Sequence, residues 1–324
     1  MTGIRLANAP CSFGAFEITV GLLPNVPGPD DVLEAIAAAG YEGTELGPPG
    51  YLGHGALLRD RLERLGLSLA GGYIPIHLSE PARWEEDLVG MAGTLDLFGA
   101  ADGAEARPVI ADAGSPARLA NPGRGAEDVD LGLDTDGWRR LAEGVRRALE
   151  LARSRGLEPT FHHHTGSHVE APWEIERLLE LTDVGLLLDT GHLAVGGGDP
   201  AQALRDWGER IDHVHVKDVR REVLESVIAD RADMTEAWRR GVFWERGTGD
   251  VDLESFSPCL RRAVTRVGSS SSKTGFPAPA RTRRRRAKPR RGTAPGSRPT
   301  PAFEGKAVYQ AALDVVRGTA CCSG

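Results

Sequence analysis

A short apolar strand, a polar residue at its end and an amphipathic helix form a unit that recurs along this chain. Helical segments such as residues 84–97 and 138–155 carry apolar residues at helical spacing. Because parallel strands need long crossovers, this alternation predicts a parallel α/β fold. Seven units are complete by Asp218, one fewer than the eight that close a TIM barrel. The strands are expected at residues 4–9, 43–46, 67–76, 107–111, 158–161, 184–188 and 211–214.

An open, doubly wound parallel sheet is the other fold that this alternation allows. Such a sheet usually carries a glycine-rich, nucleotide-binding turn after its first strand. Here the first strand is followed by Pro10-Cys-Ser-Phe-Gly, which lacks the G-x-G-x-x-G spacing. We therefore predict a (β/α)8 TIM barrel over residues 1–258, incomplete at its eighth strand.

Imidazole and carboxylate side chains gather where three consecutive strands end. Seven of the nine histidines lie between Pro159 and Asp218. The strand ends of a parallel barrel converge on one face, and imidazole with carboxylate suits a divalent metal. A single histidine at a strand end usually packs as a satisfied polar residue, but repetition at three ends favours a metal or substrate site. The clusters are His162-His-His164, Asp189-Thr-Gly-His192 and His213-Val-His-Val-Lys217.

Composition and cysteine use narrow the class of protein. No apolar run approaches the roughly 20 residues of a membrane span, and the first residues lack a signal-peptide pattern. The four cysteines show neither disulfide nor zinc-ribbon spacing. We therefore expect a reduced, cytoplasmic protein that contacts no membrane.

Charge is divided unevenly along the chain. Residues 1–258 hold 24 basic and 44 acidic side chains, whereas residues 259–324 hold 15 basic and 2 acidic ones. An acidic body argues against nucleic acid as its main partner. The tail, with a serine run and arginine clusters, has the composition of a disordered segment. A basic tail for nucleic acid or a membrane surface is the competing interpretation.

Five segments match one known pattern when they are taken together. They are Asn8-Ala-Pro-Cys-Ser-Phe-Gly-Ala-Phe-Glu17, Gly43-Thr-Glu-Leu-Gly-Pro48, Phe161-His-His-His-Thr-Gly166, Leu188-Asp-Thr-Gly-His192 and His213-Val-His-Val-Lys-Asp218. Over residues 4–258 the chain resembles the xylose isomerase-like TIM barrels, or sugar phosphate isomerases/epimerases, and among them the inosose (2-keto-myo-inositol) dehydratases. The resemblance implies an enzyme that acts on a small polyol or sugar with a divalent metal: manganese, cobalt, magnesium or zinc.

The resemblance also implies a ligand set of Glu, Asp, His and Glu on the fifth to eighth strands. The Asp corresponds to Asp189 and the His to His215. The fifth-strand Glu position is occupied by His162, which is itself a competent ligand. Glu170, further along the same loop, is a less favoured substitute.

The eighth strand of the family and its Glu are missing from the sequence. Their place reads Gly268-Ser-Ser-Ser-Ser-Lys-Thr274. If the serine codons are TCG, reading two bases later converts the run to valines, and Lys273-Thr274 to Glu-Asp. We therefore predict that residues 259–324 are a frameshifted, disordered, basic version of the family's last strand and helix.

The residues around the expected metal could remove a proton next to a carbonyl. A 2-keto polyol has an acidic C–H there, and the resulting negative charge needs a cation. We expect His192, His164 and Glu45 to bind substrate or transfer protons, and Lys217 to stabilise developing negative charge. His213 is expected to pack as a structural histidine deeper in the barrel.

Three functions remain open at this point. Loss of water defines an inosose dehydratase-like lyase. The same proton abstraction without loss of a hydroxyl defines a sugar isomerase or epimerase. The third is a truncated barrel that binds a polyol or forms a homo-oligomer without turnover, since a missing strand would leave two unpaired edges.

Overall fold

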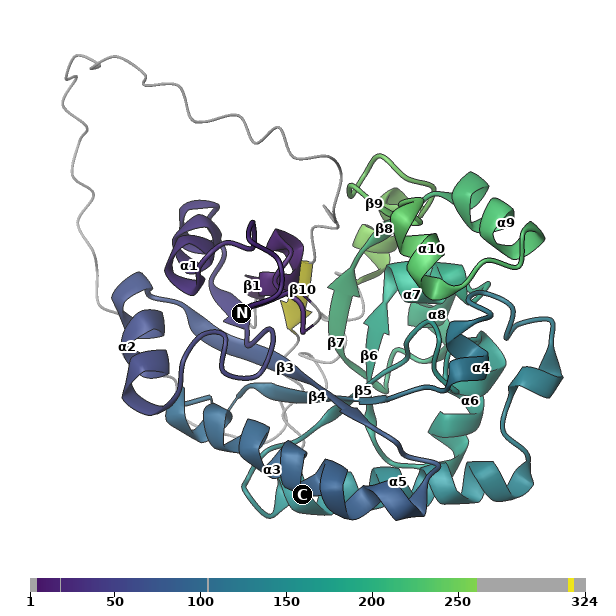
Figure 1. The fold of residues 1–324 in the computed structure, drawn as a ribbon, viewed down its shortest axis with the longest axis horizontal. Helices are drawn as coiled ribbons and strands as arrows, with labels where there is room; N and C mark the ends of the chain where they lie inside the picture. The colour runs from purple at the N-terminus through teal and green to yellow at the C-terminus, as the bar shows by residue number, and fades with distance from the viewer. Residues whose placement is uncertain (1–4, 18, 104, 261–313, 318–324) are drawn as a thin grey trace.

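The computed structural model describes residues 5–17, 19–103, 105–260 and 314–317 and shows strands wrapped by helices (Figure 1). Seven strands follow the chain: β1 (Arg5–Asn8), β2 (Gly43–Glu45), β3 (Ser68–Ile76), β4 (Arg107–Asp112), β5 (Thr160–His162), β6 (Gly185–Asp189) and β7 (Ile211–Val216). Each pairs in parallel with the next, so they curl into a barrel wall. The predicted barrel is confirmed through its seventh strand.

The place of the eighth strand is taken by a short strand of opposite direction. β10 (Asp314–Arg317) pairs antiparallel with both β1 and β7 and closes the barrel. No eighth parallel strand follows β7 in the part of the chain that the structure describes, as the sequence indicated. The two unpaired edges expected of a truncated barrel are absent from the described strands, because β10 pairs with both. The rest of the predicted tail, residues 261–313 and 318–324, lies outside the described residues.

Helices cover the outside of the barrel (Figure 1). They are α1 (Pro29–Ala38), α2 (Gly55–Leu65), α3 (Trp84–Ala100), α4 (Pro116–Leu119), α5 (Thr135–Arg153), α6 (Pro172–Leu181), α7 (Thr190–Val195) and α8 (Pro200–Asp206), with 3-10 turns η1 (Pro10–Phe13), η2 (Pro81–Arg83) and η3 (Val129–Leu131). α5 begins where the Asp134 carboxylate accepts the Gly137 N–H, and α2 ends at Gly66, whose φ of 66° suits glycine. Between the layers, strand residues such as Phe161 and Leu186 are fully buried.

A small insertion lies beside one end of the barrel (Figure 1). It consists of α9 (Arg221–Ala229), α10 (Met234–Arg239) and the antiparallel pair β8 (Asp218–Val219) and β9 (Phe243–Trp244). The Asp218 carboxylate holds the turn that follows, because it accepts the N–H groups of Gly247, Gly249 and Val251. The insertion thus combines two helices with a short antiparallel pair of strands.

One more helical segment follows the insertion. It spans residues 253–260, where the described part of this region ends. None of the described helices is long and apolar enough to cross a membrane.

Candidate metal centre and active site

Three side chains from neighbouring strand ends converge at the mouth of the barrel. His162 ends β5, Asp189 ends β6, and His215 pairs with Asp189 in the β6–β7 register. All three are buried. The Asp189 Oδ2 atom lies 3.7 Å from His162 Nε2 and 3.5 Å from His215 Nδ1. Ligands about 2.1 Å from a tetrahedral ion lie roughly 3.4 Å apart, so the spacing fits a metal. This is the set that the sequence predicted.

Asp189 is held as an anion. Its Oδ1 atom accepts the N–H groups of Gly191 and His192 at 3.0 Å each, and thereby caps α7. Its Oδ2 atom faces Lys217 Nζ at 2.8 Å. Burial raises the pKa of Asp189, but Lys217 and the neighbouring histidines outweigh it and hold the pKa well below the usual range. The fixed carboxylate therefore directs Oδ2 toward the converging imidazoles.

Glu45, at the end of β2, lies behind His215 rather than free in the mouth. Its Oε1 atom is 2.9 Å from His215 Nε2 and 3.4 Å from His213 Nε2. Burial raises the pKa of Glu45, but the imidazoles of His215 and His213 lower it by more. The net effect is a lowered pKa, so the carboxyl stays ionised. With Nε2 engaged by Glu45, His215 turns Nδ1 toward Asp189, as in carboxylate–histidine–metal arrangements. Glu45, His213 and His215 also form a candidate ligand group of their own.

His164 and His192 form a stacked pair next to the three converging side chains. Their ring centroids are 3.9 Å apart, with 36° between the planes. Burial lowers the pKa of His164 to about 4 and also lowers the pKa of His192, so both rings are neutral near pH 7. Together with His162 they make a third group whose ring nitrogens lie within 4.8 Å. The structure therefore brings both predicted proton-transfer histidines to the site.

Lys217 directs its ammonium into the site and not toward its neighbour in the chain. Its Nζ atom meets Asp189 and lies 5.7 Å from the centre of the Phe243 ring. The carboxylate of Asp218, the next residue in the chain, instead accepts backbone N–H groups.

Sequence reasoning missed three residues at the site. Thr165 contacts both stacked histidines through its backbone and hydroxyl. Phe243, from the insertion, packs 4.8 Å from the His192 ring. The Tyr73 ring on β3 lies 6.2 Å from His162 and 6.0 Å from His164. No spacing rule marks them, because each reaches the site through tertiary packing.

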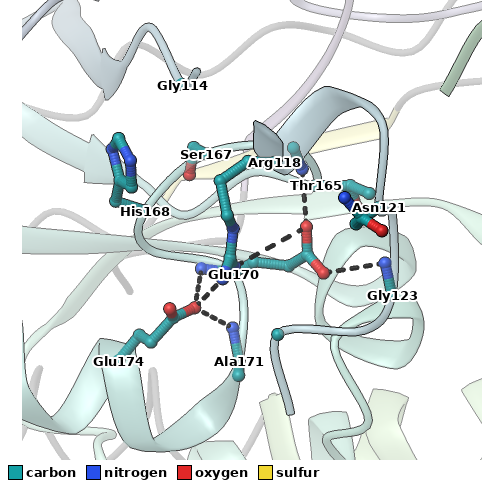
Figure 2. Close-up of polar contacts among 12 residues, drawn as sticks. Gly114, Arg118, Asn121, Gly123, Thr165, Ser167, His168, Glu170, Ala171 and Glu174 are labelled. Carbon is teal, nitrogen blue, oxygen red and sulfur yellow. Dashed lines mark hydrogen bonds and ion pairs between the residues drawn. The ribbon is translucent and has the colours of Figure 1, made fainter. Parts of the chain in front are cut away.

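A buried ionic cluster supports the loop that carries His164 and Thr165 (Figure 2). Arg118 on α4 meets Glu174 Oε2 at 2.9 Å and Glu170 Oε2 at 4.0 Å. The Glu170 carboxylate accepts the N–H groups of Gly166 at 2.5 Å and Gly123 at 2.8 Å. It is thereby fixed in this cluster and belongs to none of the three ligand groups in the described residues. Glu170, the less favoured substitute for the fifth-strand ligand, thus lies outside the three candidate ligand groups of the described residues.

Comparisons with known proteins identify the family to which this barrel belongs. The profile of the family described as "Xylose isomerase-like TIM barrel" matches residues 33–264. An inosose dehydratase of Geobacillus kaustophilus is 35% identical over 234 residues, which cover 69% of this chain and 73% of that protein. One from Bacillus thuringiensis is 30% identical over 235 residues, covering 69% and 75%. One from Clostridium perfringens is 39% identical over 125 residues, covering 38% and 42%.

Solved structures with a similar fold are also known. The IolI protein with a binding zinc atom has a TM-score of 0.58 at 12% identity, over 79% of this chain and 84% of that one. D-allulose 3-epimerase from Methylomonas sp. in complex with D-allulose has a TM-score of 0.55 at 16% identity, over 79% of each chain. At these low sequence identities the two structures show only that the fold is shared. With the profile match and the 35% identical relative, the chain belongs to the xylose isomerase-like TIM-barrel family.

Proposed function

We propose that this protein is a metal-dependent lyase of the inosose dehydratase type, which removes water from a keto-polyol. The observation that carries the proposal is the convergence of His162, Asp189 and His215 beside the stacked pair His164 and His192. Relatives named inosose dehydratase support the substrate class.

The three converging residues fit a divalent cation by their chemistry. Burial lowers the pKa of His162 and leaves its imidazole neutral, while Asp189 is ionised. His162, Asp189 and His215 would hold the ion, and two imidazoles suit zinc, cobalt or manganese better than magnesium. When bound, such an ion supplies a Lewis acid that stabilises negative charge on a substrate oxygen.

The surrounding residues orient the substrate and limit water. Lys217 places a positive charge beside Asp189, where it stabilises the enolate oxygen that forms when a proton leaves the neighbouring carbon. Phe243 packs on His192 from the insertion and keeps the proton-transfer side of the site apolar. His164 and His192 lie next to His162 and are neutral, so one can accept a proton from a bound substrate and the other donate one.

Metal content and turnover test the proposal together. We expect the purified chain to contain close to one equivalent of a transition metal by elemental analysis, and to convert inosose to its dehydrated diketone. Removal of the metal by a chelator should abolish turnover, and D189N should lose both metal and turnover. Exposed Asp183 offers a matched control, D183N, which should retain both.

Two other outcomes assign the chain differently. Solvent deuterium entering a ketose without loss of water would assign an isomerase or epimerase, because that reaction stops after the proton transfer. Bound metal with no turnover on inosose or any ketose would contradict the enzyme proposal and favour a polyol-binding barrel.

A further inference from the structure

Thr165 contacts the two stacked histidines with three different polar atoms. Its carbonyl oxygen lies 2.8 Å from His164 Nδ1. Its backbone N–H donates to His192 Nδ1 at 3.2 Å, and its Oγ1 lies 2.9 Å from the same nitrogen. Because a carbonyl only accepts and a backbone N–H only donates, these contacts determine where the hydrogen of each neutral ring lies.

The two rings hold their hydrogens on opposite nitrogens. His164 donates its Nδ1–H to the Thr165 carbonyl, so its Nε2 has a free lone pair. His192 accepts the Thr165 N–H at Nδ1, so its hydrogen is on Nε2. One ring therefore presents an acceptor and the other a donor.

We propose that His164 Nε2 is the base that takes the substrate proton and that His192 Nε2–H is the acid that protonates the departing hydroxyl. This inference rests on the proposed lyase function. His164 takes the proton from the carbon next to the carbonyl, and the C–H electron pair forms the enolate. When the carbonyl re-forms, that electron pair becomes the new carbon–carbon double bond, the adjacent C–O bond breaks, and the oxygen takes the His192 Nε2 proton and leaves as water. The proton gained by His164 replaces the one that His192 gives up, so both rings end the step as neutral imidazoles. A ring nitrogen of each histidine lies within 4.8 Å of one on the other, which is close enough for this transfer directly or through one water.

The same assignment excludes one candidate metal group. His162, His164 and His192 offer ring nitrogens within 4.8 Å of one another. His192 has no lone pair to offer, because Nδ1 faces the Thr165 N–H and Nε2 carries the hydrogen. Metal binding at this group is not expected, which leaves His164 and His192 for proton transfer.

The hydrogen positions can be measured without any activity. In the full chain labelled with ¹⁵N-histidine, ring-nitrogen shifts and two-bond couplings should show His164 with its hydrogen on Nδ1 and His192 with its hydrogen on Nε2. Spectra of H164Q and H192Q assign the two rings. The opposite pattern at either ring overturns the inference, whatever the turnover.

Isotope exchange separates the two roles. We expect H192Q to exchange the substrate α-proton with D₂O at close to the normal rate but to lose dehydration by about 10²- to 10⁴-fold. H164Q should lose both reactions, and H54Q, at an exposed position on α2's N-terminal side, should lose neither. Exchange that persists in H164Q would overturn the assignment. If the hydrogens lie as expected but the unaltered protein neither exchanges nor dehydrates any keto-polyol, the lyase function fails and the tautomer assignment stands.

Discussion

The sequence places Glu45 among the residues expected to bind substrate or transfer protons. In the structure Glu45 contacts His215, which indicates a different role. Its carboxylate engages His215 Nε2 at 2.9 Å, on the side of the ring away from Asp189. Residues in this position orient a metal-binding histidine and increase its basicity. Glu45 is therefore placed to act, through His215, on a metal held at the proposed site.

Replacing Glu45 tests this role. We expect E45Q to weaken metal affinity by about 10- to 100-fold, because the neutral amide orients His215 less firmly and no longer increases the basicity of its ring. Competition with a chelator of known affinity measures the change. E42Q, at an exposed position just before β2, should leave the affinity unaltered. If Glu45 contacts substrate instead, metal affinity will stay constant and only KM or kcat will change.

At the scale of elements, the buried cluster of Arg118, Glu170 and Glu174 connects three segments (Figure 2). Arg118 comes from α4, Glu174 caps the first turn of α6 by accepting the N–H of Ala171, and Glu170 holds Gly166 beside Thr165. Burial raises the pKa of Glu170 to about 7, Glu174 adds to the rise, and Arg118 opposes it. The loop that carries His164 and Thr165 is therefore supported by the Glu170 carboxyl, which titrates near neutral pH.

This titration predicts a pH-dependent stability. The Glu170 pKa of about 7 exceeds the value of about 4.3 in an unfolded chain, so the folded state binds the proton more tightly. The stabilisation is complete below about pH 4 and is lost as pH rises to about 7, a change of roughly 4 kcal/mol. Urea unfolding at pH 5 and pH 8 should show this loss in the unaltered protein.

The E170Q variant isolates that contribution. The amide does not titrate and its oxygen serves only one of the two N–H groups, so we expect E170Q to be about 1–3 kcal/mol less stable than the unaltered protein at pH 5. The difference should shrink at pH 8, because only the unaltered protein loses the stability linked to the Glu170 proton. E176Q, at an exposed position on α6, the helix that follows Glu170, serves as the matched control. An equal difference at both pH values would contradict a Glu170 pKa near 7.

The elements themselves were predictable, and their contacts were not. Strand–helix alternation reflects the periodic burial of each element, so β3 and β6 fall close to their expected ranges. The gathering of the histidines at the mouth of the barrel was also predictable, because parallel strands end on one face. The Arg118–Glu174 pair joins residues 56 apart in sequence. Such a contact depends on how two loops pack, which neither periodicity nor motif spacing records.

At the scale of the whole molecule, the direction of β10 decides what the barrel can present at its mouth. A parallel eighth strand would end at the mouth and could bring a fourth ligand there, as the family resemblance implied. β10 runs the other way: Asp314 pairs with Val216 near the mouth, and Arg317 pairs with His213 and Arg5 farther down. The barrel is closed, but the chain reaches the mouth at the beginning of its last strand instead of the end.

The nucleotide sequence and a repaired gene test whether this closure replaces a lost unit. We expect TCG codons for Ser269 to Ser272, and a restored reading frame should supply a parallel eighth strand with its Glu. The added carboxylate should raise metal affinity by about tenfold or more, and the melting temperature should rise in metal because binding stabilises the folded state. Chelator competition and thermal unfolding, with and without metal, measure both. Other serine codons would end the frameshift hypothesis. An unaltered affinity in the repaired chain would mean that His162, Asp189 and His215 already form the whole protein ligand set.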